Sequence, residues 1–167
     1  MNQEINIQGM SIFVHEEGQG VPMLMLHGSP DTGAMWQPLI DRLKDKIRCI
    51  APDLPGFGRS TLPDGYKLTL DNFASFMNEL LDKLNIHEPV YLVSADFGSH
   101  YSQAFLVKYP ERVRGVVVGN TTFHREYGWH GFAKLYRVPL LGELLIATPK
   151  SMLKQSMKQF APALPPT

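Results

Sequence analysis

Short apolar runs alternate with amphipathic stretches along the first 120 residues of the chain. Four of these runs stop at loop-forming residues, which is typical of buried strands. They span residues 21–26, 47–51, 89–93 and 113–118. Residues 5–16 alternate more weakly around Gly9, and this pattern predicts two edge strands joined by a turn.

Helical periodicity fills most of the segments between these runs. Apolar residues recur at helical spacing from Met35 to Leu43. A longer apolar face runs from Leu70 to Leu84, directly after Thr69, which can cap a helix. A third helix is expected at about 98–109. Strands that alternate with helices predict an α/β fold with a mostly parallel sheet and right-handed crossovers.

The character of the chain changes after Asn120. Residues 121–167 have a helical pattern with several aromatic side chains, and no further strand pattern follows. We therefore predict a core at 1–120, followed by a separate helical segment at 121–167. The strand at 113–118 would then be an open edge of the sheet. Such an edge invites pairing with another chain, so we expect self-association through it.

Composition and charge narrow the class of protein. The 167 residues are 44% hydrophobic, and 16 basic residues balance 16 acidic ones, so nothing indicates a nucleic-acid or anionic-membrane partner. No apolar run approaches the roughly 18 residues of a transmembrane helix, and the N-terminus lacks a signal-peptide pattern. Cys49 lies in an apolar run, which predicts a buried thiol. No residues cluster at metal-ligand spacing. We expect a cytoplasmic protein that acts on a small molecule without metal or other cofactor.

The strongest chemical signal is the segment Val93-Ser94-Ala95-Asp96-Phe97-Gly98-Ser99. A buried strand runs into a sharp turn and a helix begins at once, which is the pattern of a nucleophile elbow. Small residues around Asp96 would let strand and helix approach closely. The helix N-terminus would stabilise negative charge nearby. Taken alone, the segment also fits an Asp that only caps a helix.

Two further motifs follow the ends of earlier predicted strands. They are His27-Gly28-Ser29-Pro30 and Pro52-Asp53-Leu54-Pro55-Gly56-Phe57-Gly58-Arg59-Ser60. Together with the elbow, and with Tyr-Pro-Glu-Arg-Val at 109–113, they make the chain resemble the α/β-hydrolase family over about residues 5–120. The resemblance implies an α/β-hydrolase fold with Asp96 as its catalytic nucleophile, and it makes the capping interpretation the weaker one.

The resemblance also implies roles for the residues around the nucleophile. The backbone N–H groups of Ser29 and Phe97 would stabilise charge on the oxyanion or the leaving group. His27 and Gly28 would belong to the oxyanion loop, where the histidine organises the backbone. Asp53 is expected to fix its loop rather than to react.

An aspartate nucleophile favours particular chemistry. A carboxylate displaces leaving groups well at saturated carbon, and water activated by a histidine then cleaves the alkyl ester. The family members that work in this way are haloalkane dehalogenases, haloacid-type dehalogenases and epoxide hydrolases. The resemblance therefore implies a small, mostly apolar substrate with a carbon–halogen or epoxide bond. The alternatives are an ester hydrolase relative in which Asp has replaced Ser, and a non-catalytic binding protein of the same fold.

The chain departs from both groups of relatives. Haloalkane dehalogenases usually carry Asn after His-Gly and Trp after the nucleophile, where this chain has Ser29 and Phe97. Epoxide hydrolases usually carry Gly-His-Asp, where this chain has Ser94-Ala95-Asp96. The choice between the two kinds of bond is therefore left open.

Other catalytic groups of the family have no clear match in the sequence. The resemblance implies that residues 121–167 are the start of the helical lid of the family. Tyr127 and Tyr136 lie in this predicted lid, where epoxide hydrolases place a leaving-group acid, although packing is the commoner role. Asn120 stands where some relatives place the triad acid, and an amide cannot serve as a carboxylate. We expect the catalytic His and the acid to lie beyond Thr167. In that case the chain could be alkylated once but could not complete the reaction.

Overall fold

The structure is a computed structural model that describes residues 1–121, 134 and 138–142. Contacts between residues divide the chain into a first unit, Met1–Thr122, and a second unit, Phe123–Thr167. Every strand that the described residues form belongs to the first unit. The predicted lid falls almost entirely outside the described residues.

The chain begins with an antiparallel hairpin of β1 (Asn2–Ile7) and β2 (Met10–Glu17). Its two turn residues, Gln8 and Gly9, have φ values of 51° and 81°, as tight hairpin turns require. Of these two strands, only β1 lies at an edge of the sheet, because β2 also pairs with β4 (Ile47–Pro52). The prediction of two edge strands is therefore right for β1 and wrong for β2.

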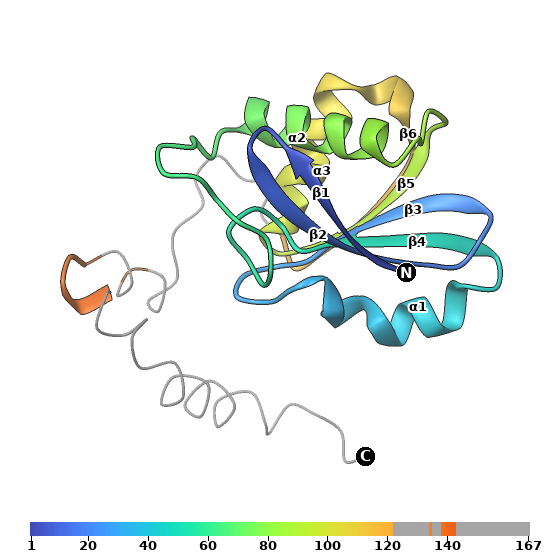
Figure 1. Cartoon of the computed structure of the whole chain (residues 1–167), viewed down its shortest axis with the longest axis horizontal. Coiled ribbons are helices and arrows are strands. Elements are labelled where there is room, and N and C mark those ends of the chain that lie inside the picture. The colour runs from blue at the N-terminus through green and yellow to red at the C-terminus, as the bar shows by residue number, and fades with distance from the viewer. Residues whose placement is uncertain (122–133, 135–137, 143–167) are drawn as a thin grey trace, which may run out of the picture. The chain divides into compact units, whose positions relative to one another are not determined.

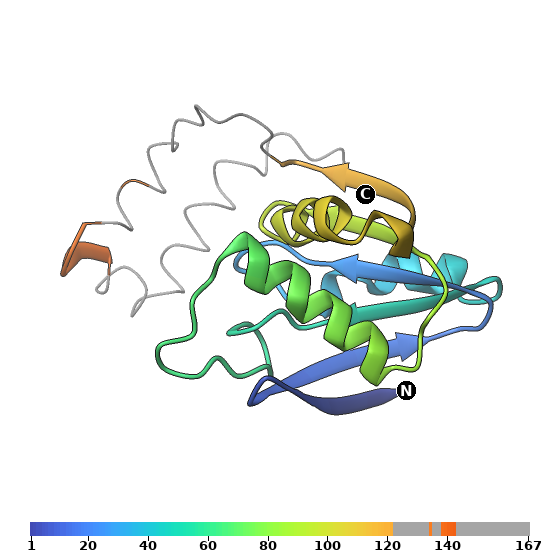
Figure 2. The same cartoon turned by 90° about the horizontal axis from the view of Figure 1, so that it is seen from above.

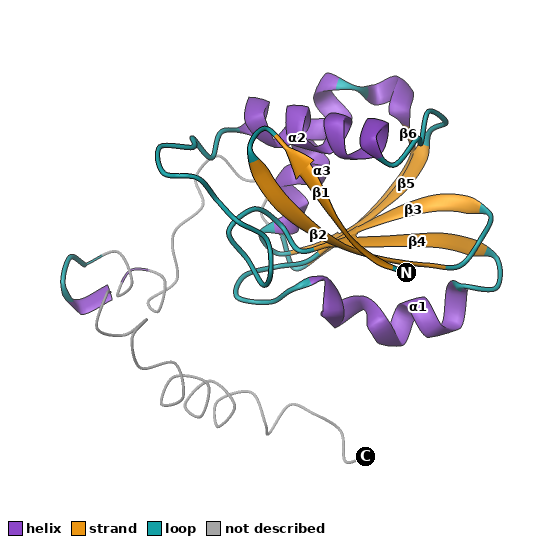
Figure 3. Ribbon diagram, in the orientation of Figure 1, coloured by secondary structure: helices purple, strands orange, loops and turns teal. Residues whose placement is uncertain are grey.

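The other four strands run parallel to one another at the predicted places. They are β3 (Val21–Leu26), β4 (Ile47–Pro52), β5 (Val90–Ala95) and β6 (Val113–Gly119). The order across the sheet is β1-β2-β4-β3-β5-β6. Since β4 and β5 flank β3, the carboxyl ends of these three strands meet at one end of the sheet, where Figure 3 shows the long loops.

Helices cover both faces of the sheet. Figures 1 and 2 show α2 and α3 on one face and α1 on the other. The helices are η1 (Gly33–Trp36), α1 (Gln37–Leu43), α2 (Leu70–Lys83), α3 (Gly98–Lys108) and η2 (Pro110–Arg112). A mostly parallel sheet between layers of helices confirms the predicted α/β class.

The ends of the helices follow from local chemistry. The Thr69 hydroxyl accepts a hydrogen bond from the Asn72 N–H at 3.2 Å and caps α2, as predicted. The helix after the elbow ends at Lys108, one residue before the predicted end, because Pro110 disfavours a helical conformation of Tyr109. The segment predicted as helix from Met35 begins as the 3₁₀ turn η1 before α1.

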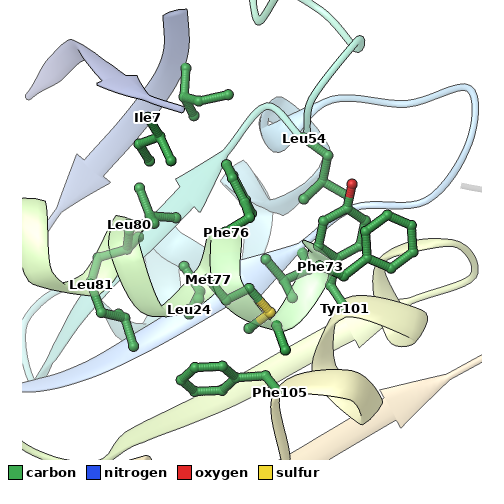
Figure 4. Close-up of a cluster of buried hydrophobic side chains, with 14 of the residues drawn as sticks. Ile7, Leu24, Leu54, Phe73, Phe76, Met77, Leu80, Leu81, Tyr101 and Phe105 are labelled. Carbon is green, nitrogen blue, oxygen red and sulfur yellow. The ribbon is translucent and has the colours of Figure 1, made fainter. Parts of the chain in front are cut away.

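Two apolar layers hold the sheet between its helices. The larger layer packs β-strand side chains against α2 and α3, and Figure 4 shows Phe76 and Leu80 among its members. The smaller layer lies against α1 and contains Met25, Ile40 and Cys49, which confirms the predicted burial of the thiol. Burying one such large apolar side chain stabilises a fold by about 1.5–3 kcal/mol. These layers fix the strands, and the strands fix the loops at their carboxyl ends.

Within residues 1–121, 134 and 138–142, no helix is both long enough and apolar enough to cross a membrane.

Candidate active site

Asp96 lies at the turn between β5 and α3. It is exposed, and its φ of 46° lies in the left-handed region that residues other than glycine rarely adopt. Two hydrogen bonds hold this turn: the Asp96 N–H donates to the Gly119 carbonyl at 3.2 Å, and the Ser99 N–H donates to the Asp96 carbonyl at 3.1 Å. Strained backbone of this kind occurs where the surrounding structure enforces it, commonly at functional sites.

Gly98 allows α3 to begin directly against the end of β3. A Cβ at this position would lie 2.5 Å from the Leu26 carbonyl oxygen and 2.4 Å from the His27 carbonyl oxygen. No side chain fits there unless the backbone moves. The close approach of strand and helix that the small residues predicted is therefore present.

The loop after β3 carries His27 to Pro30 to the side of Asp96. The Ser29 N–H donates to Asp96 Oδ2 at 2.9 Å, and the Ser29–Pro30 peptide bond is cis. A Cβ on Gly28 would lie 2.7 Å from Asp96 Cβ, so glycine is what allows the loop to come this close. Among the described residues, no donor is hydrogen-bonded to Asp96 Oδ1. The carboxylate thus has one oxygen held and one oxygen open.

His27 is fully buried beneath this loop. Its Nδ1 lies 2.8 Å from the Gly28 carbonyl oxygen, and its Nε2 accepts a hydrogen bond from the Leu54 N–H at 2.8 Å. Burial lowers the pKa of His27, against the opposing effects of the Gly28 carbonyl and of the carboxylates of Asp53 and Asp31. The neutral imidazole joins the loops that follow β3 and β4, which agrees with the expected organising role.

Asp53 holds the loop after β4 in place. Its Oδ1 accepts from the Gly33 N–H at 2.8 Å, and its Oδ2 accepts from the Arg59 N–H at 2.9 Å. Ser60 Oγ donates to the Asp53 carbonyl at 2.7 Å and accepts from the Phe13 N–H at 2.9 Å. Asp53 is nearly fully buried and both of its carboxylate oxygens are engaged. This geometry agrees with the expected loop-fixing role.

Phe97 has a ring that points into an aromatic cluster. The ring centroids of Phe57, Phe73, His100 and Tyr101 lie 5.7–5.9 Å from that of Phe97. The side chain therefore anchors the start of α3. Among the described residues, the Phe97 N–H has no hydrogen-bond acceptor, so this donor is available to a ligand.

The serines near Asp96 are inaccessible. Ser94 and Ser99 are buried, and so is Ser102 one turn further along α3. Their hydroxyls, like that of buried Tyr101, find no hydrogen-bond partner within the part of the chain that the structure describes. Burial also raises the pKa of Tyr101. A reagent in solution would meet the Asp96 carboxylate and none of these hydroxyls.

The structure brings together five of the predicted site residues and leaves two untested. His27, Gly28, Ser29, Asp96 and Phe97 meet at the carboxyl end of the sheet. Tyr127 and Tyr136, the candidate lid acids, lie outside the described residues. No cluster of His, Cys, Asp and Glu that could hold a metal ion occurs in the described ranges.

Two contributors were missed from the sequence. The Leu54 N–H that fixes His27 is a backbone group, and a backbone group leaves no signal in the identity of its residue. Phe57, whose ring makes an edge contact with His27 and a tilted contact with Phe97, sits between two glycines in a loop. A large aromatic residue between two glycines of a strand-end loop was the one available signal.

Ligand sites of parallel α/β proteins lie at the carboxyl ends of the strands, and this site has that place. Residues 21–138 match the α/β hydrolase fold family. The chain therefore belongs to the α/β-hydrolase family, and the predicted fold and family are confirmed.

Two curated relatives are similar to this chain. The cis-3-alkyl-4-alkyloxetan-2-one decarboxylase of Shewanella oneidensis is 40% identical over 119 residues, which cover 70% of this chain and 37% of the relative. Haloalkane dehalogenase 2 of Mycobacterium tuberculosis is 40% identical over 109 residues, which cover 65% of this chain and 37% of the relative. The chain thus spans little more than a third of the length of these relatives.

Solved structures of the same fold include two hydrolases. The haloalkane dehalogenase DatA of Agrobacterium tumefaciens superposes with a TM-score of 0.80 at 26% identity, over 96% of this chain and 56% of DatA. A variant of an epoxide hydrolase from Bacillus megaterium superposes with a TM-score of 0.67 at 30% identity, over 71% of this chain and 42% of the enzyme. The chain is thus similar to both kinds of enzyme that its aspartate had suggested.

Proposed function

We propose that Asp96 is the nucleophile of a hydrolase that attacks a saturated carbon bearing a halide or an epoxide oxygen. One observation carries this proposal: the Asp96 carboxylate is exposed on a left-handed turn, with Oδ2 held by the Ser29 N–H and Oδ1 open. In this reading the turn is a nucleophile elbow. It presents the attacking oxygen in a fixed direction at the N-terminus of α3.

The first step forms an ester on the enzyme. Asp96 Oδ1 attacks the carbon, and the bond to the halide or to the epoxide oxygen breaks with its electron pair on the leaving atom. The Phe97 N–H is the free donor nearest in sequence to the nucleophile, so we assign it to charge stabilisation. Ser29 is exposed, and its hydroxyl can donate to the same leaving atom.

The second step cleaves that ester with water. Once Oδ1 carries the alkyl group, Oδ2 becomes the ester carbonyl oxygen, which already faces the Ser29 N–H. Water attack places negative charge on Oδ2, so a donor that holds the resting carboxylate would also stabilise the oxyanion. The base that activates this water is proposed to lie outside residues 1–167.

The two proposed substrate classes, halides and epoxides, need different groups to stabilise the leaving atom. For a halide, the described residues offer no indole N–H beside Asp96, because Phe97 has a hydrocarbon ring and turns it into the core. An epoxide oxygen needs an acid, and we keep Tyr127 and Tyr136 as candidates for it. The ester-hydrolase alternative is the weaker one, because attack by a carboxylate on an ester carbonyl gives an unfavourable anhydride.

A second candidate reaction is the decarboxylation of an oxetan-2-one, favoured by the 40% identity to the Shewanella enzyme. Asp96 Oδ1 would attack the saturated ring carbon that bears the ring oxygen, and that oxygen would leave as a carboxylate tethered through the neighbouring carbon. Loss of CO₂ would then form a carbon–carbon double bond and expel Asp96 from the neighbouring carbon. This sequence consumes no water, so it needs no base.

Covalent labelling tests the proposed nucleophile. The chain is incubated with 1-bromobutane or with styrene oxide, and the adduct is mapped by peptide mass spectrometry. We expect a single adduct on Asp96 and none in Asp96→Asn, whose amide is not nucleophilic. An adduct on Ser94 or Ser99 would overturn the assignment, and no adduct with either reagent would favour a non-catalytic binding protein.

Turnover separates the two candidate reactions. With 1-bromobutane or styrene oxide, the chain should react with one equivalent at most, because the proposed base lies outside residues 1–167. General-base assistance contributes about 10²–10⁴-fold to ester cleavage, so the alkyl ester should persist without it. With a 3,4-dialkyloxetan-2-one, the second candidate predicts repeated release of alkene and CO₂. Repeated release of bromide or diol would show that a base is present within residues 1–167.

A further inference from the structure

The two ring nitrogens of His27 have different, fixed tasks. The Leu54 backbone N–H can only donate, so Nε2 of His27 must accept from it and carries no proton. The neutral ring therefore has its proton on Nδ1, which donates to the Gly28 carbonyl at 2.8 Å. Full burial of the ring leaves no water to replace either partner.

The Gly28 carbonyl and the Ser29 N–H belong to one planar peptide group. The carbonyl end accepts from His27 Nδ1 at 2.8 Å and from the Asp31 N–H at 3.0 Å. The N–H end donates to Asp96 Oδ2 at 2.9 Å. Two donors on the carbonyl fix the peptide plane. They also draw electron density away from its nitrogen, because hydrogen bonds in a chain polarise one another.

We infer that His27 is a positioning residue that aims and polarises the Gly28–Ser29 peptide, so that the Ser29 N–H becomes a stronger donor to Asp96 Oδ2. This inference rests on the proposed role of Asp96 as nucleophile. His27 does not touch the substrate or the reacting atoms. It acts through one peptide group.

The inference predicts opposite demands in the two chemical steps. During attack by Oδ1, negative charge leaves the Asp96 carboxylate, so a strong donor on Oδ2 gives no acceleration. During cleavage of the ester, charge builds up on Oδ2, so the same donor stabilises the transition state. Loss of the His27 donor should therefore slow ester cleavage and leave alkylation as fast as before, or slightly faster.

Two substitutions separate the two tasks of the ring. An amide placed by His27→Asn has its nitrogen near the position of Nδ1, so it can still donate to the Gly28 carbonyl but cannot reach Leu54. An amide placed by His27→Gln has its oxygen near the position of Nε2, so it can still accept from Leu54 but cannot donate to Gly28. A purely structural histidine would be replaced equally well or equally badly by both.

The experiment alkylates Asp96 in the 167-residue chain with 1-bromobutane and then cleaves the ester with hydroxylamine, which attacks the same carbonyl. We expect His27→Gln to slow cleavage roughly tenfold, less than the ~10²–10³-fold cost of losing a whole oxyanion donor. We expect His27→Asn to retain most of the rate, and alkylation to be no slower in either variant. Equal cleavage rates in the wild type and His27→Gln, or a rate in His27→Asn as low as in His27→Gln, would overturn the inference.

The Ser29 amide proton provides a second readout that needs no reaction. In ¹H–¹⁵N spectra, a weakened hydrogen bond should move the Ser29 amide proton upfield in His27→Gln and leave it near the wild-type position in His27→Asn. If Asp96 takes up no reagent, the proposed function fails, and this shift still decides the inference. An unchanged Ser29 resonance in a folded His27→Gln protein would overturn it.

Discussion

The turn at Asp96 and the edge strand β6 differ in how many hydrogen bonds hold them, although the turn directly follows β5, the strand that pairs with β6. Around Asp96, the buried side chains of His27 and Asp53 accept and donate hydrogen bonds that join the strand-end loops. Along β6, by contrast, only one side pairs with a strand of the described residues, and Val117 is 65% exposed. The hydrogen bonds that hold the first region all come from within residues 1–121, whereas β6 has a strand partner on only one side among the described residues and exposes an apolar side chain.

The opposite edge of the sheet sharpens this contrast. β1 exposes Asn2, Glu4 and Asn6, and polar or charged side chains of this kind discourage pairing with another chain. β6 instead exposes Val117 and carries one charge, on Arg114. The polar side chains of β1 can protect that edge against pairing with another chain, whereas β6 has few side chains of this kind. If the two regions differ in energy as they do in contacts, matched substitutions in them should have unequal effects on the free energy of unfolding.

The largest effect is expected for Gly98→Ala. Its Cβ would lie within 2.5 Å of two backbone carbonyl oxygens, so the strand or the helix must move, and we expect a loss of about 3 kcal/mol or more in the free energy of unfolding. Gly119→Ala in β6 is the matched control, because its Cβ would meet nothing within 4 Å. Urea unfolding measures both. A cost of under about 1 kcal/mol for Gly98→Ala would mean that the turn is not tightly packed.

A smaller loss is expected for Arg112→Ala. The Arg112 guanidinium donates to Asn78 Oδ1 at 2.6 Å, to Asp82 Oδ1 at 2.7 Å and to the Ile86 carbonyl at 2.5 Å. Its removal leaves these acceptors of α2 and the loop after it without their donor, which should cost about 2 kcal/mol.

Arg114→Ala is the matched control for Arg112→Ala. Arg114 lies on β6 with its guanidinium carbon 5.9 Å from the centroid of the Tyr91 ring. Its replacement should lower the free energy of unfolding, measured in urea, by less than about 0.5 kcal/mol. Equal losses for the two arginines would mean that the hydrogen bonds of Arg112 to α2 and the following loop stabilise the fold no more than the exposed contact of Arg114 on β6.

Much of the fold could be predicted because burial imposes its period on the sequence. The run from Val21 to Leu26 and the helix after Thr69 were found in this way. The place of β2 was not, because a weak alternation tells which face is buried and not which strand lies alongside. The site followed the same rule. Asp96 and the motif His27–Pro30 could be predicted from their residue types. The hydrogen bonds that hold them involve backbone N–H groups, which almost any residue supplies.

The pH dependence of stability should report the buried His27. Its pKa is lowered in the folded protein, so below about pH 6.5, the usual value for an unfolded histidine, the unfolded chain binds more protons than the folded one. Stability is therefore full above that pH and falls as the pH drops toward the folded pKa, by at most about 1.4 kcal/mol per pH unit. His87→Gln, at an exposed position, should keep this slope and His27→Asn should reduce it. Urea unfolding between pH 7 and pH 5 checks both, and equal slopes would contradict the role of burial.

The smallest effect on stability, and the sharpest test of the open edge, is expected for Val117→Lys. Val117 is exposed, so a lysine there buries no charge and should change the free energy of unfolding by less than about 0.5 kcal/mol. If β6 pairs with a second copy of the chain, the added lysines would face that copy and repel it, as edge lysines do in natural sheets. We therefore expect the wild-type chain to self-associate with rising concentration in sedimentation velocity, and Val117→Lys to shift the distribution toward monomer. Val107→Lys is the control, because Val107 is 84% exposed but lies on α3 rather than on an edge strand. A wild-type chain that stays monomeric, or a loss of association in Val107→Lys as large as in Val117→Lys, would mean that the backbone edge of β6 is not what brings copies together.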